Sequence, residues 1–428
     1  MTQTTFNGWR DGLSYGLMGL PLAFVALPLY VILPNHYARE FGVPLATLGA
    51  ILLGARLFDA VIDPLLGRWS DRLFVRSTRA VLLFSAMAIL VLAIGFAGLF
   101  FPATNEPKSL LVWASALLVL TYAAYSAVSV AHQSWGAMLG GDEAQRSRIV
   151  AWREGLGLLG VLLASIAPVA LGLRWTVVIF YVALIVGWLA WTRAAKPQTS
   201  PTFKTVDLWL PFARPAFRRL LLVFMLNGIA SAIPATLILF FVQDRLQAPA
   251  NMEPVFLGSY FLCAALTIPL WLKVVKRIGL ARAWSLGMAL SVAVFIFATQ
   301  LHAGDTAGFI AVCALSGVAL GTDLALPAAL LAGTILEAGD RGRAEGAYFG
   351  WWNFATKLNL ALAAGLALPV LGAFGYAPGV RSESALQALV VAYCVLPCLL
   401  KLSALTALYF LIIRPASKPK ASPLKDSP

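Results

Sequence analysis

Long apolar runs alternate with short polar segments along the whole chain, and each run is about as long as a helix that crosses a bilayer. A spanning helix needs about 20 consecutive apolar residues. The pattern predicts twelve spans, at residues 12–34, 44–66, 80–101, 110–139, 150–172, 175–192, 219–243, 254–272, 283–301, 306–336, 346–376 and 384–412.

The apolar runs are continuous, which favours helices over the alternating strands of a membrane β-barrel. Backbone groups in lipid must be paired within the segment, and a helix does this. The composition agrees, because 60% of the 428 residues are hydrophobic and only 12% are charged. The first run continues too far for a cleavable signal, so we expect it to be retained as a span. The predicted class is an all-α integral membrane protein.

The net charge of +13 could suggest a nucleic-acid partner, but the positions of the basic residues point elsewhere. With the N-terminus inside, 24 of the 32 lysines and arginines fall in inner segments and five in outer segments. Such a bias sets the orientation of membrane proteins. We therefore expect both termini in the cytoplasm, a cell inner (plasma) membrane location, and no nucleic-acid partner.

A polar, proline-containing stretch divides the twelve spans into two groups of six. It predicts an N-terminal six-helix bundle at 1–192, a cytoplasmic linker at 193–218 and a C-terminal six-helix bundle at 219–414. The Lys-, Pro- and Ser-rich tail at 415–428 is expected to be disordered.

The loop expected after the second span reads Gly67-Arg-Trp-Ser-Asp71-Arg72, and a similar basic loop follows the eighth span. The first matches G-x-x-x-D-R, a signature typical of the major facilitator superfamily. That resemblance implies two six-helix bundles that alternate access to a site near the midplane. Asp71, Arg72 and Arg153 are predicted to form a gate, although a basic turn that only obeys the charge bias is the alternative.

Three charged side chains lie inside the second span. At about 100° per residue, Arg56, Asp59 and Asp63 fall near 0°, 300° and 340° around a helix, so they share one face. Charges in hydrocarbon are costly and are usually functional. Two carboxylates one turn apart suit a bound Na⁺, held by oxygen ligands, or a carried proton. A static ion network is the alternative.

Lys357 lies inside the eleventh span, where a buried ammonium needs a negative partner. Asp59 or Asp63 is the expected partner, and an anionic group on the substrate is the alternative. Arg56 and Lys357 are thus predicted charge partners of the cation site.

Polar and aromatic side chains in the other spans are candidates for binding a solute. They are Tyr15, Tyr125, His132, Trp135 and Asn353. A lone buried histidine is more often structural than functional, so a structural role for His132 is the alternative. Asp323, inside the tenth span, needs a donor partner, and the sequence offers no role for Lys401.

The segment Ala55-Arg56-Leu-Phe-Asp59-Ala-Val-Ile-Asp63-Pro64-Leu-Leu-Gly67 closely resembles the pattern A-R-x-x-D-A-x-x-D-P-x-x-G of the melibiose permease family. This is the glycoside–pentoside–hexuronide:cation symporter family within the major facilitator superfamily. Leu13-Ser-Tyr-Gly16, Trp135, Arg153 and Lys357 resemble further family positions.

The resemblance implies cation-coupled uptake, with Asp59 and Asp63 as cation ligands and Lys357 nearby. Two positions depart from the family. Ala23 and Ala131 stand where melibiose permeases have sugar-binding aspartates. The cation motif is therefore intact, whereas melibiose-like specificity is not expected.

We therefore expect a Na⁺- or H⁺-coupled symporter, for a sugar or glycoside-like solute, that acts as a monomer in the bilayer. It needs no cofactor beyond the coupling ion, and no nucleophile, metal-cluster or phosphate-loop motif suggests an enzyme. A flippase or transporter of lysophospholipid or another amphiphile is the alternative, followed by a membrane sensor that does not transport.

Overall fold

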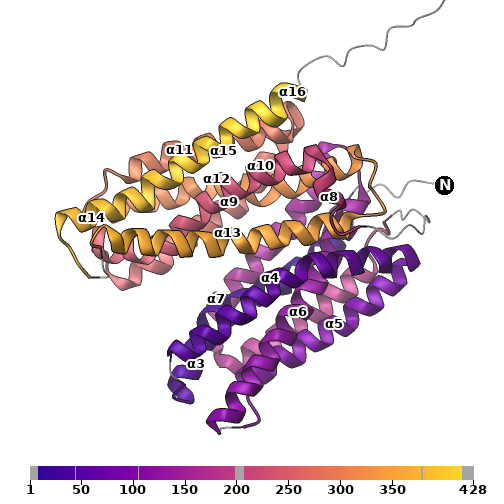
Figure 1. The fold of residues 1–428 in the computed structure, drawn as a ribbon, viewed down its shortest axis with the longest axis horizontal. Helices are drawn as coiled ribbons and strands as arrows, with labels where there is room; N and C mark the ends of the chain where they lie inside the picture. Colours follow the sequence, from indigo (N-terminus) through magenta and orange to yellow (C-terminus); the bar gives the residue numbers. More distant parts are fainter. Residues whose placement is uncertain (1–7, 44, 105, 198–206, 377–378, 417–428) are drawn as a thin grey trace, which may run out of the picture. The chain divides into compact units, whose positions relative to one another are not determined.

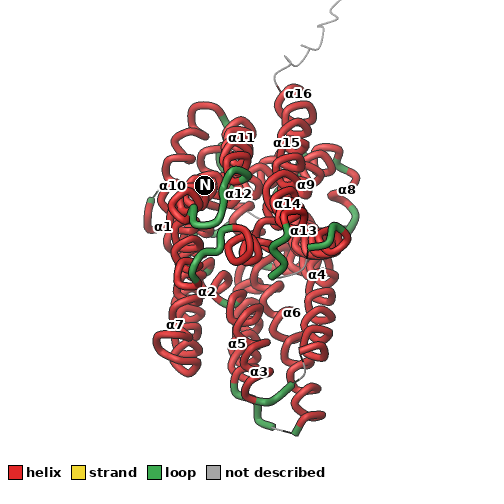
Figure 2. The backbone as a smooth tube through the Cα atoms, turned by 90° about the vertical axis from the view of Figure 1, so that its left-hand side faces the viewer, coloured by secondary structure: helices red, strands yellow, loops and turns green. Residues whose placement is uncertain are grey.

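The computed structural model describes residues 8–43, 45–104, 106–197, 207–376 and 379–416. Across these ranges the backbone forms helices and connecting loops without a β-strand (Figures 1 and 2). The predicted all-α class is confirmed. The longer helices are α4 (Leu45–Arg76), α5 (Thr78–Phe100), α6 (Pro107–Leu139), α7 (Glu143–Thr192), α9 (Pro215–Phe240), α10 (Glu253–Ile278), α11 (Leu280–Ala298), α12 (Thr306–Glu337), α13 (Glu345–Ala373) and α15 (Leu396–Leu408).

Shorter helical elements begin, connect or end these helices. They are α1 (Trp9–Gly16), α2 (Gly19–Phe24), η1 (Pro28–Ile32), α3 (Leu33–Glu40), α8 (Leu210–Ala213), η2 (Phe241–Arg245), η3 (Ala250–Met252), α14 (Glu383–Val390), η4 (Val391–Val395), η5 (Tyr409–Ile413) and α16 (Arg414–Ala416). The first predicted span is consequently a series of short elements from α1 to α3. Proline has no amide hydrogen to donate within a helix, so residues such as Pro28 favour these interruptions.

Nine helical segments of the described chain are long and apolar enough to cross a membrane. They cover predicted spans 3 to 10 and 12. The fifth and sixth spans join in α7 at Gly172, whose φ of 82° is readily adopted by glycine. Helix α4 covers the second predicted span, and α13 covers most of the eleventh.

Helix α4 continues ten residues beyond the predicted end of its span at 66, so the G-x-x-x-D-R segment is helical and not a loop. No helix breaker lies between Gly67 and Arg76, and the turn follows only at Ser77. The Ser77 hydroxyl caps α5 by accepting a hydrogen bond from the amide of Ala80 at 3.0 Å. Pro64 lies inside α4 without ending it.

The chain packs as two compact units. The first contains Met1–Arg214, Ala265–Lys276 and Leu324–Leu358, and the second contains Pro215–Ala264, Arg277–Asp323 and Asn359–Pro428. This grouping describes packing in one conformation, and the division of the chain at 193–218 stays a prediction. Residues 198–206 of the predicted linker and 417–428 of the predicted tail lie outside the described residues.

Within the first unit, α4 packs against α6, α6 against α5, and α1 and α2 against α7. Its apolar core includes Phe24, Phe96, Leu118 and Phe180. Within the second unit, α15 packs against α9 and α11, and the core includes Phe241 and Phe309. The candidate cation residues therefore lie in the first unit, on α4 and on the first half of α13.

Candidate functional site

The two aspartates of α4 are withdrawn from solvent and lipid. Asp59 is 1% exposed and Asp63 is 0% exposed. They are four residues apart, so they occupy successive turns on one face of the helix. A pair of buried carboxylates is unfavourable unless positive charge and hydrogen-bond donors surround it.

Lys357 of α13 supplies that positive charge. Its Nζ lies 2.7 Å from Oδ2 of Asp59 and 2.7 Å from Oδ2 of Asp63. It also donates to Oγ of Ser126 at 2.8 Å and to the carbonyl oxygen of Asp59 at 3.2 Å. The ammonium therefore lies among four oxygen atoms, two of them carboxylate oxygens, and the expected pairing of Lys357 with the aspartates is present.

Ser126 of α6 completes this cluster. Its hydroxyl donates to Oδ1 of Asp59 at 2.6 Å, and it accepts from Lys357. Ser126 is not among the residues predicted from the sequence, although its neighbour Tyr125 is. The available signal was its position as a hydroxyl midway along an apolar span, which is weak because serine also occurs in packed membrane helices.

The cluster formed by Asp59, Asp63, Ser126 and Lys357, here named the α4 ion cluster, carries a formal charge of −1 when every group is ionised. Oδ1 of Asp63 has no hydrogen-bond partner among the described residues. A buried acceptor without a donor is costly. The cluster therefore has excess negative charge and a buried carboxylate oxygen without a donor in the described part of the chain.

Arg56 differs from the aspartates although it lies on the same helical face. Its side chain is exposed, whereas Asp59 one turn later is buried. Helical angle alone does not determine burial, because neighbouring helices cover α4 unequally along its length. The role of Arg56 as a charge partner stays a prediction.

Helices α4 and α13 approach each other backbone to backbone just beyond the α4 ion cluster. A β-carbon on Gly67 would lie 2.0 Å from the carbonyl oxygen of Gly346, and one on Gly350 would lie 2.6 Å from that of Asp63. Only residues without a side chain permit such an approach. Gly67, the last residue of the span-2 motif, thus allows α13 to bring Lys357 to the aspartates.

Replacing Gly67 with valine is expected to prevent this close packing and to expose the end of α4. The readout is maleimide labelling of a cysteine placed at Ser70, a residue that is 3% exposed. We expect labelling at least about tenfold faster in Gly67→Val, because buried side chains react only after local opening.

Gly54→Val is the matched control, since a β-carbon on Gly54, also in α4, would meet no atom within 4 Å. It should leave the labelling rate at Ser70→Cys unchanged. Equal rates in both valine variants would contradict the proposed role of Gly67.

Beyond the glycines, Asp71 binds the start of α13. Its Oδ1 accepts from the amide of Gly346 at 2.6 Å, and its Oδ2 accepts from that of Ala347 at 2.9 Å. A carboxylate at a helix N-terminus satisfies free amides and interacts favourably with the helix dipole. Of the other predicted gate residues, Arg72 is exposed, and Arg153 pairs with Glu154 at 3.2 Å.

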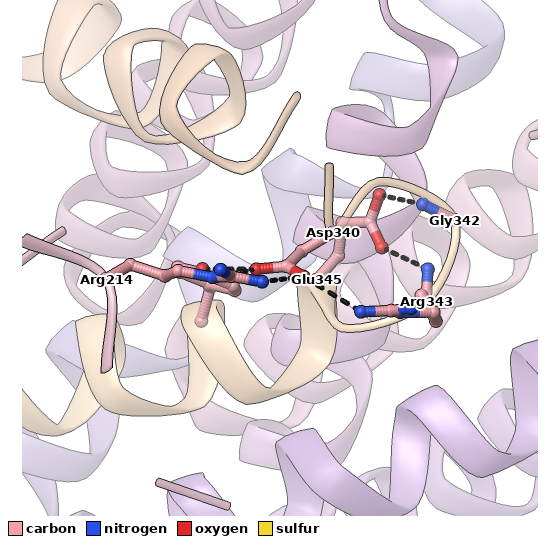
Figure 3. Close-up of polar contacts among 6 residues, drawn as sticks. Arg214, Asp340, Gly342, Arg343 and Glu345 are labelled. Carbon is pink, nitrogen blue, oxygen red and sulfur yellow. Dashed lines mark hydrogen bonds and ion pairs between the residues drawn. The ribbon is translucent and has the colours of Figure 1, made fainter. Parts of the chain in front are cut away.

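Next to this contact, the loop before α13 is held by two more buried carboxylates (Figure 3). Glu345 accepts from the amides of Gly342 at 2.6 Å and Arg343 at 3.1 Å. Asp340 accepts from Arg214 through both oxygens at 2.9 Å, from Arg343 at 3.0 Å and from Tyr348 at 2.8 Å. Bidentate arginine contacts of this kind are strong and specific in geometry. Neither Asp340 nor Glu345 is among the residues predicted from the sequence.

Glu345 lies outside the predicted spans, and burial raises its pKa from 4.5 to about 7. Burial, together with the nearby Glu345, raises the pKa of Asp71 well above its ordinary value. When folding raises the pKa of a carboxyl group, the folded protein binds more protons than the unfolded protein at any pH between the two pKa values. The stabilising contribution of Glu345 is therefore complete below about pH 4.5 and is lost as the pH rises to about 7.

Glu345→Gln should consequently make the thermal denaturation midpoint less dependent on pH between 4.5 and 8. The wild-type contribution lost over this range is on the order of 3 kcal/mol. The exposed Glu337 provides the control, because Glu337→Gln should keep the wild-type slope. A Glu345→Gln profile as steep as that of the wild type would contradict the assignment.

The predicted solute-binding residues of the first unit are mostly engaged with each other and with the backbone. Tyr15 donates to the carbonyl oxygen of His132 at 3.1 Å, and the two rings stack with centroids 4.3 Å apart. His132 Nε2 lies 2.8 Å from the carbonyl oxygen of Tyr15, and Trp135 donates to that of Ala195 at 2.9 Å. In this conformation the three residues have packing roles, while Tyr125 and Asn353 are half-buried. Their part in solute binding stays a prediction.

Tyr15 and Arg153 also line a cavity of about 10 Å³, together with Gln133 and Arg146. A space of this size holds at most one water molecule. In this conformation the cavity is too small for a sugar. Ala131, which the resemblance to melibiose permeases aligns with a sugar-binding aspartate, is fully buried.

A second intramembrane ion pair occurs in the second unit, between the two residues that the sequence left without partners. Lys401 Nζ lies 2.7 Å from Oδ2 of Asp323. Lys401 is therefore the donor that was expected for Asp323, and Asp323 in turn is the negative partner of Lys401.

A family model described as "MFS/sugar transport protein" matches residues 14–414 of the chain. The symporter YjmB of Bacillus subtilis (strain 168), named as uncharacterized, is 24% identical over 395 residues, which are 86% of this chain and 84% of that protein. YagG of Escherichia coli (strain K12), provisionally named a glycoside/cation symporter, is 27% identical over 167 residues, which are 39% of this chain and 35% of YagG.

Among solved structures, FucP, a transporter of the major facilitator superfamily in its outward conformation, superposes with a TM-score of 0.66 at 16% identity. The match covers 94% of this chain and 98% of FucP. At this identity the match shows the fold alone, and it confirms the predicted major facilitator fold. The family model, together with the apolar helices, identifies a multi-pass membrane protein of a transporter family.

Proposed function

Because this chain belongs to the MFS/sugar transport protein family, we propose that it is a secondary active symporter that couples uptake of a sugar or glycoside-like solute to Na⁺ or H⁺. The observation that carries the proposal is the α4 ion cluster, in which the Lys357 ammonium lies within 2.7 Å of both buried aspartates.

The ammonium occupies a position that a coupling cation would also take, surrounded by carboxylate, hydroxyl and carbonyl oxygens. Such oxygens are ligands that hard cations such as Na⁺ prefer. When no cation is bound, Lys357 offsets one of the two negative charges, so that the empty site does not hold two buried carboxylates without a counter-charge. A cation that binds would compete with Lys357 for the same oxygens.

This competition gives a mechanism of coupling. Lys357 lies on α13, and the start of α13 is fixed to α4 by Gly67 and Asp71. Displacement of the ammonium from Asp59 and Asp63 would remove one of the contacts that hold α13 against α4. Cation binding would then favour release of this packing, a shift between two states that differ in affinity for the cation.

The solute class is proposed from the family description, which names sugar transport, and from the name of YagG. Ala131 is buried where related permeases have a carboxylate. Melibiose-like recognition through that position is therefore not part of the proposal. The proposed solute is a sugar or glycoside that forms hydrogen bonds with neutral side chains such as Asn353.

The test is uptake into proteoliposomes of methyl β-D-glucoside, methyl β-D-xyloside or D-glucuronate, each under an imposed Na⁺ or H⁺ gradient. Accumulation above the external concentration for at least one solute is the expected result. The proposal fails if none accumulates with either gradient while lysophosphatidylcholine moves between leaflets without a gradient, which would indicate the amphiphile transporter.

A further inference from the structure

The second unit contains a buried charged group that the proposed coupling mechanism does not use. Lys401 donates to Ser231 at 3.0 Å as well as pairing with Asp323, and Trp284 donates to Oδ1 of Asp323 at 2.8 Å. The side chains of Lys401 and Asp323 are 9% and 13% exposed. One positive and one negative charge cancel, so this group is neutral overall.

A cavity of about 340 Å³ lies beside this ion pair, and both of its residues line it. This volume falls within the range of small-molecule sites, which are typically apolar with a few polar groups. Six helical elements (α9, α10, α11, α12, η4 and α15) contribute to its walls. Most of the lining is apolar, with Pro234, Ile238, Phe261, Val292, Phe295 and Leu320 among the residues.

The cavity has a second polar position two helical turns from the ion pair. Ser316 and Asp323 both line the cavity from α12, and seven residues at 1.5 Å each separate them by about 10 Å along the axis. Ser316 is 8% exposed, and its hydroxyl has no hydrogen-bond partner among the described residues. A bound hydroxyl at this end would satisfy that group, since a buried polar atom left unpaired is costly.

We propose that this cavity binds an uncharged, elongated molecule with an aromatic or aliphatic middle and a hydroxyl group at each end. One hydroxyl pairs with Asp323 and Lys401, the apolar middle contacts Phe261 and Phe295, and the other hydroxyl pairs with Ser316. A charged ligand of the same shape is disfavoured. It would lose its hydration on binding, and the site has no net opposite charge to compensate for that loss. This site is independent of the α4 ion cluster and of the predicted sugar-binding residues.

The probe is 4-(2-hydroxyethyl)phenol, which is uncharged, has about ten non-hydrogen atoms and carries a hydroxyl at each end. Two matched probes of nearly the same shape differ in charge, namely 4-hydroxyphenylacetate with one negative charge and tyramine with one positive charge. Equilibrium dialysis measures the binding of each to the full chain in lipid nanodiscs, with empty nanodiscs subtracted.

Saturable binding of the neutral probe with a Kd of about 1 mM or tighter is expected, since even modest contacts give this affinity to a small ligand. Each charged probe should bind at least about tenfold more weakly. No saturable binding of the neutral probe, or equal binding of all three, would overturn the proposal.

Two variants assign the binding to this cavity. Val312, which is 3% exposed, lines it, so Val312→Phe should fill the space and abolish binding. Ser316→Ala is a conservative change that keeps the proposal testable if the larger one does not fold, and it should weaken binding about five- to tenfold. Unchanged affinity in Ser316→Ala excludes the two-ended mode.

The variant with Asp59→Asn and Asp63→Asn is the control. It should bind the neutral probe as the wild type does, because it leaves the second unit unaltered. Loss of binding in this variant would overturn the assignment. The proposed function is tested separately by gradient-driven uptake, so failure of one proposal does not imply failure of the other.

Discussion

Replacing Asp59 and Asp63 together with asparagine is expected to abolish solute accumulation driven by a cation gradient. Asparagine keeps the size and an oxygen of each side chain but removes both negative charges of the α4 ion cluster. A tenfold Na⁺ gradient that drives one ion per solute supports about tenfold accumulation, because 1.4 kcal/mol is a factor of ten. In the double variant the accumulation ratio should fall to about 1, measured in proteoliposomes with the solute identified by the uptake screen.

Exchange of labelled for unlabelled solute, measured without any cation gradient, separates loss of coupling from loss of folding. An exposed aspartate supplies the matched control, because Asp305→Asn removes a carboxylate without touching the cluster. It should accumulate solute as the wild type does. Full accumulation by the double variant would refute the assignment of Asp59 and Asp63 as the seat of the coupling ion.

Removing the ammonium is expected to have the second large effect. Lys357→Met leaves two buried carboxylates without a counter-charge, and breaking a buried ion pair costs about 3–5 kcal/mol. The thermal denaturation midpoint should fall strongly in Na⁺-free buffer at pH 8. Addition of Na⁺, or a lower pH, should restore much of it, because either cation now occupies the oxygens that Lys357 held.

Lys401→Met is the matched control for this experiment. It also removes a buried ammonium, but it leaves one carboxylate, Asp323, which retains the hydrogen bond from Trp284. We expect destabilisation without rescue by Na⁺, since a single carboxylate provides few ligands for the ion. Similar Na⁺ rescue in both variants would argue against a specific cation site at the α4 ion cluster.

The fold was largely predictable because its main determinant is local. A bilayer selects each spanning helix by its length and apolarity, and both can be read from neighbouring residues. The breaks in the first predicted span and the extension of α4 to Arg76 were harder to predict. The breaks depend on where prolines interrupt a helix. The extension depends on where the next helix is capped, as Ser77 caps α5.

The candidate site was predictable only in part. Asp59 and Asp63 stood out because an intramembrane carboxylate is costly, and the same reasoning required a counter-charge for Lys357. Ser126 carried no such signal, because a neutral hydroxyl in a helix costs little. The pairing of Lys401 with Asp323 was not predictable either. The charges alone did not indicate which of the several helices would lie next to each other.

The sequence by itself determined the helical membrane class, the positions of most apolar helices and the charged residues that the bilayer makes costly. Only the tertiary structure decided which of these residues meet. It brought Lys357 to aspartates 298 and 294 positions earlier in the chain, joined Tyr15 to His132, and left a cavity beside Lys401. The physical reason is that the energy of a charge in lipid depends on the residue itself, whereas its partner depends on how closely helices pack, as Gly67 permits α4 and α13 to do.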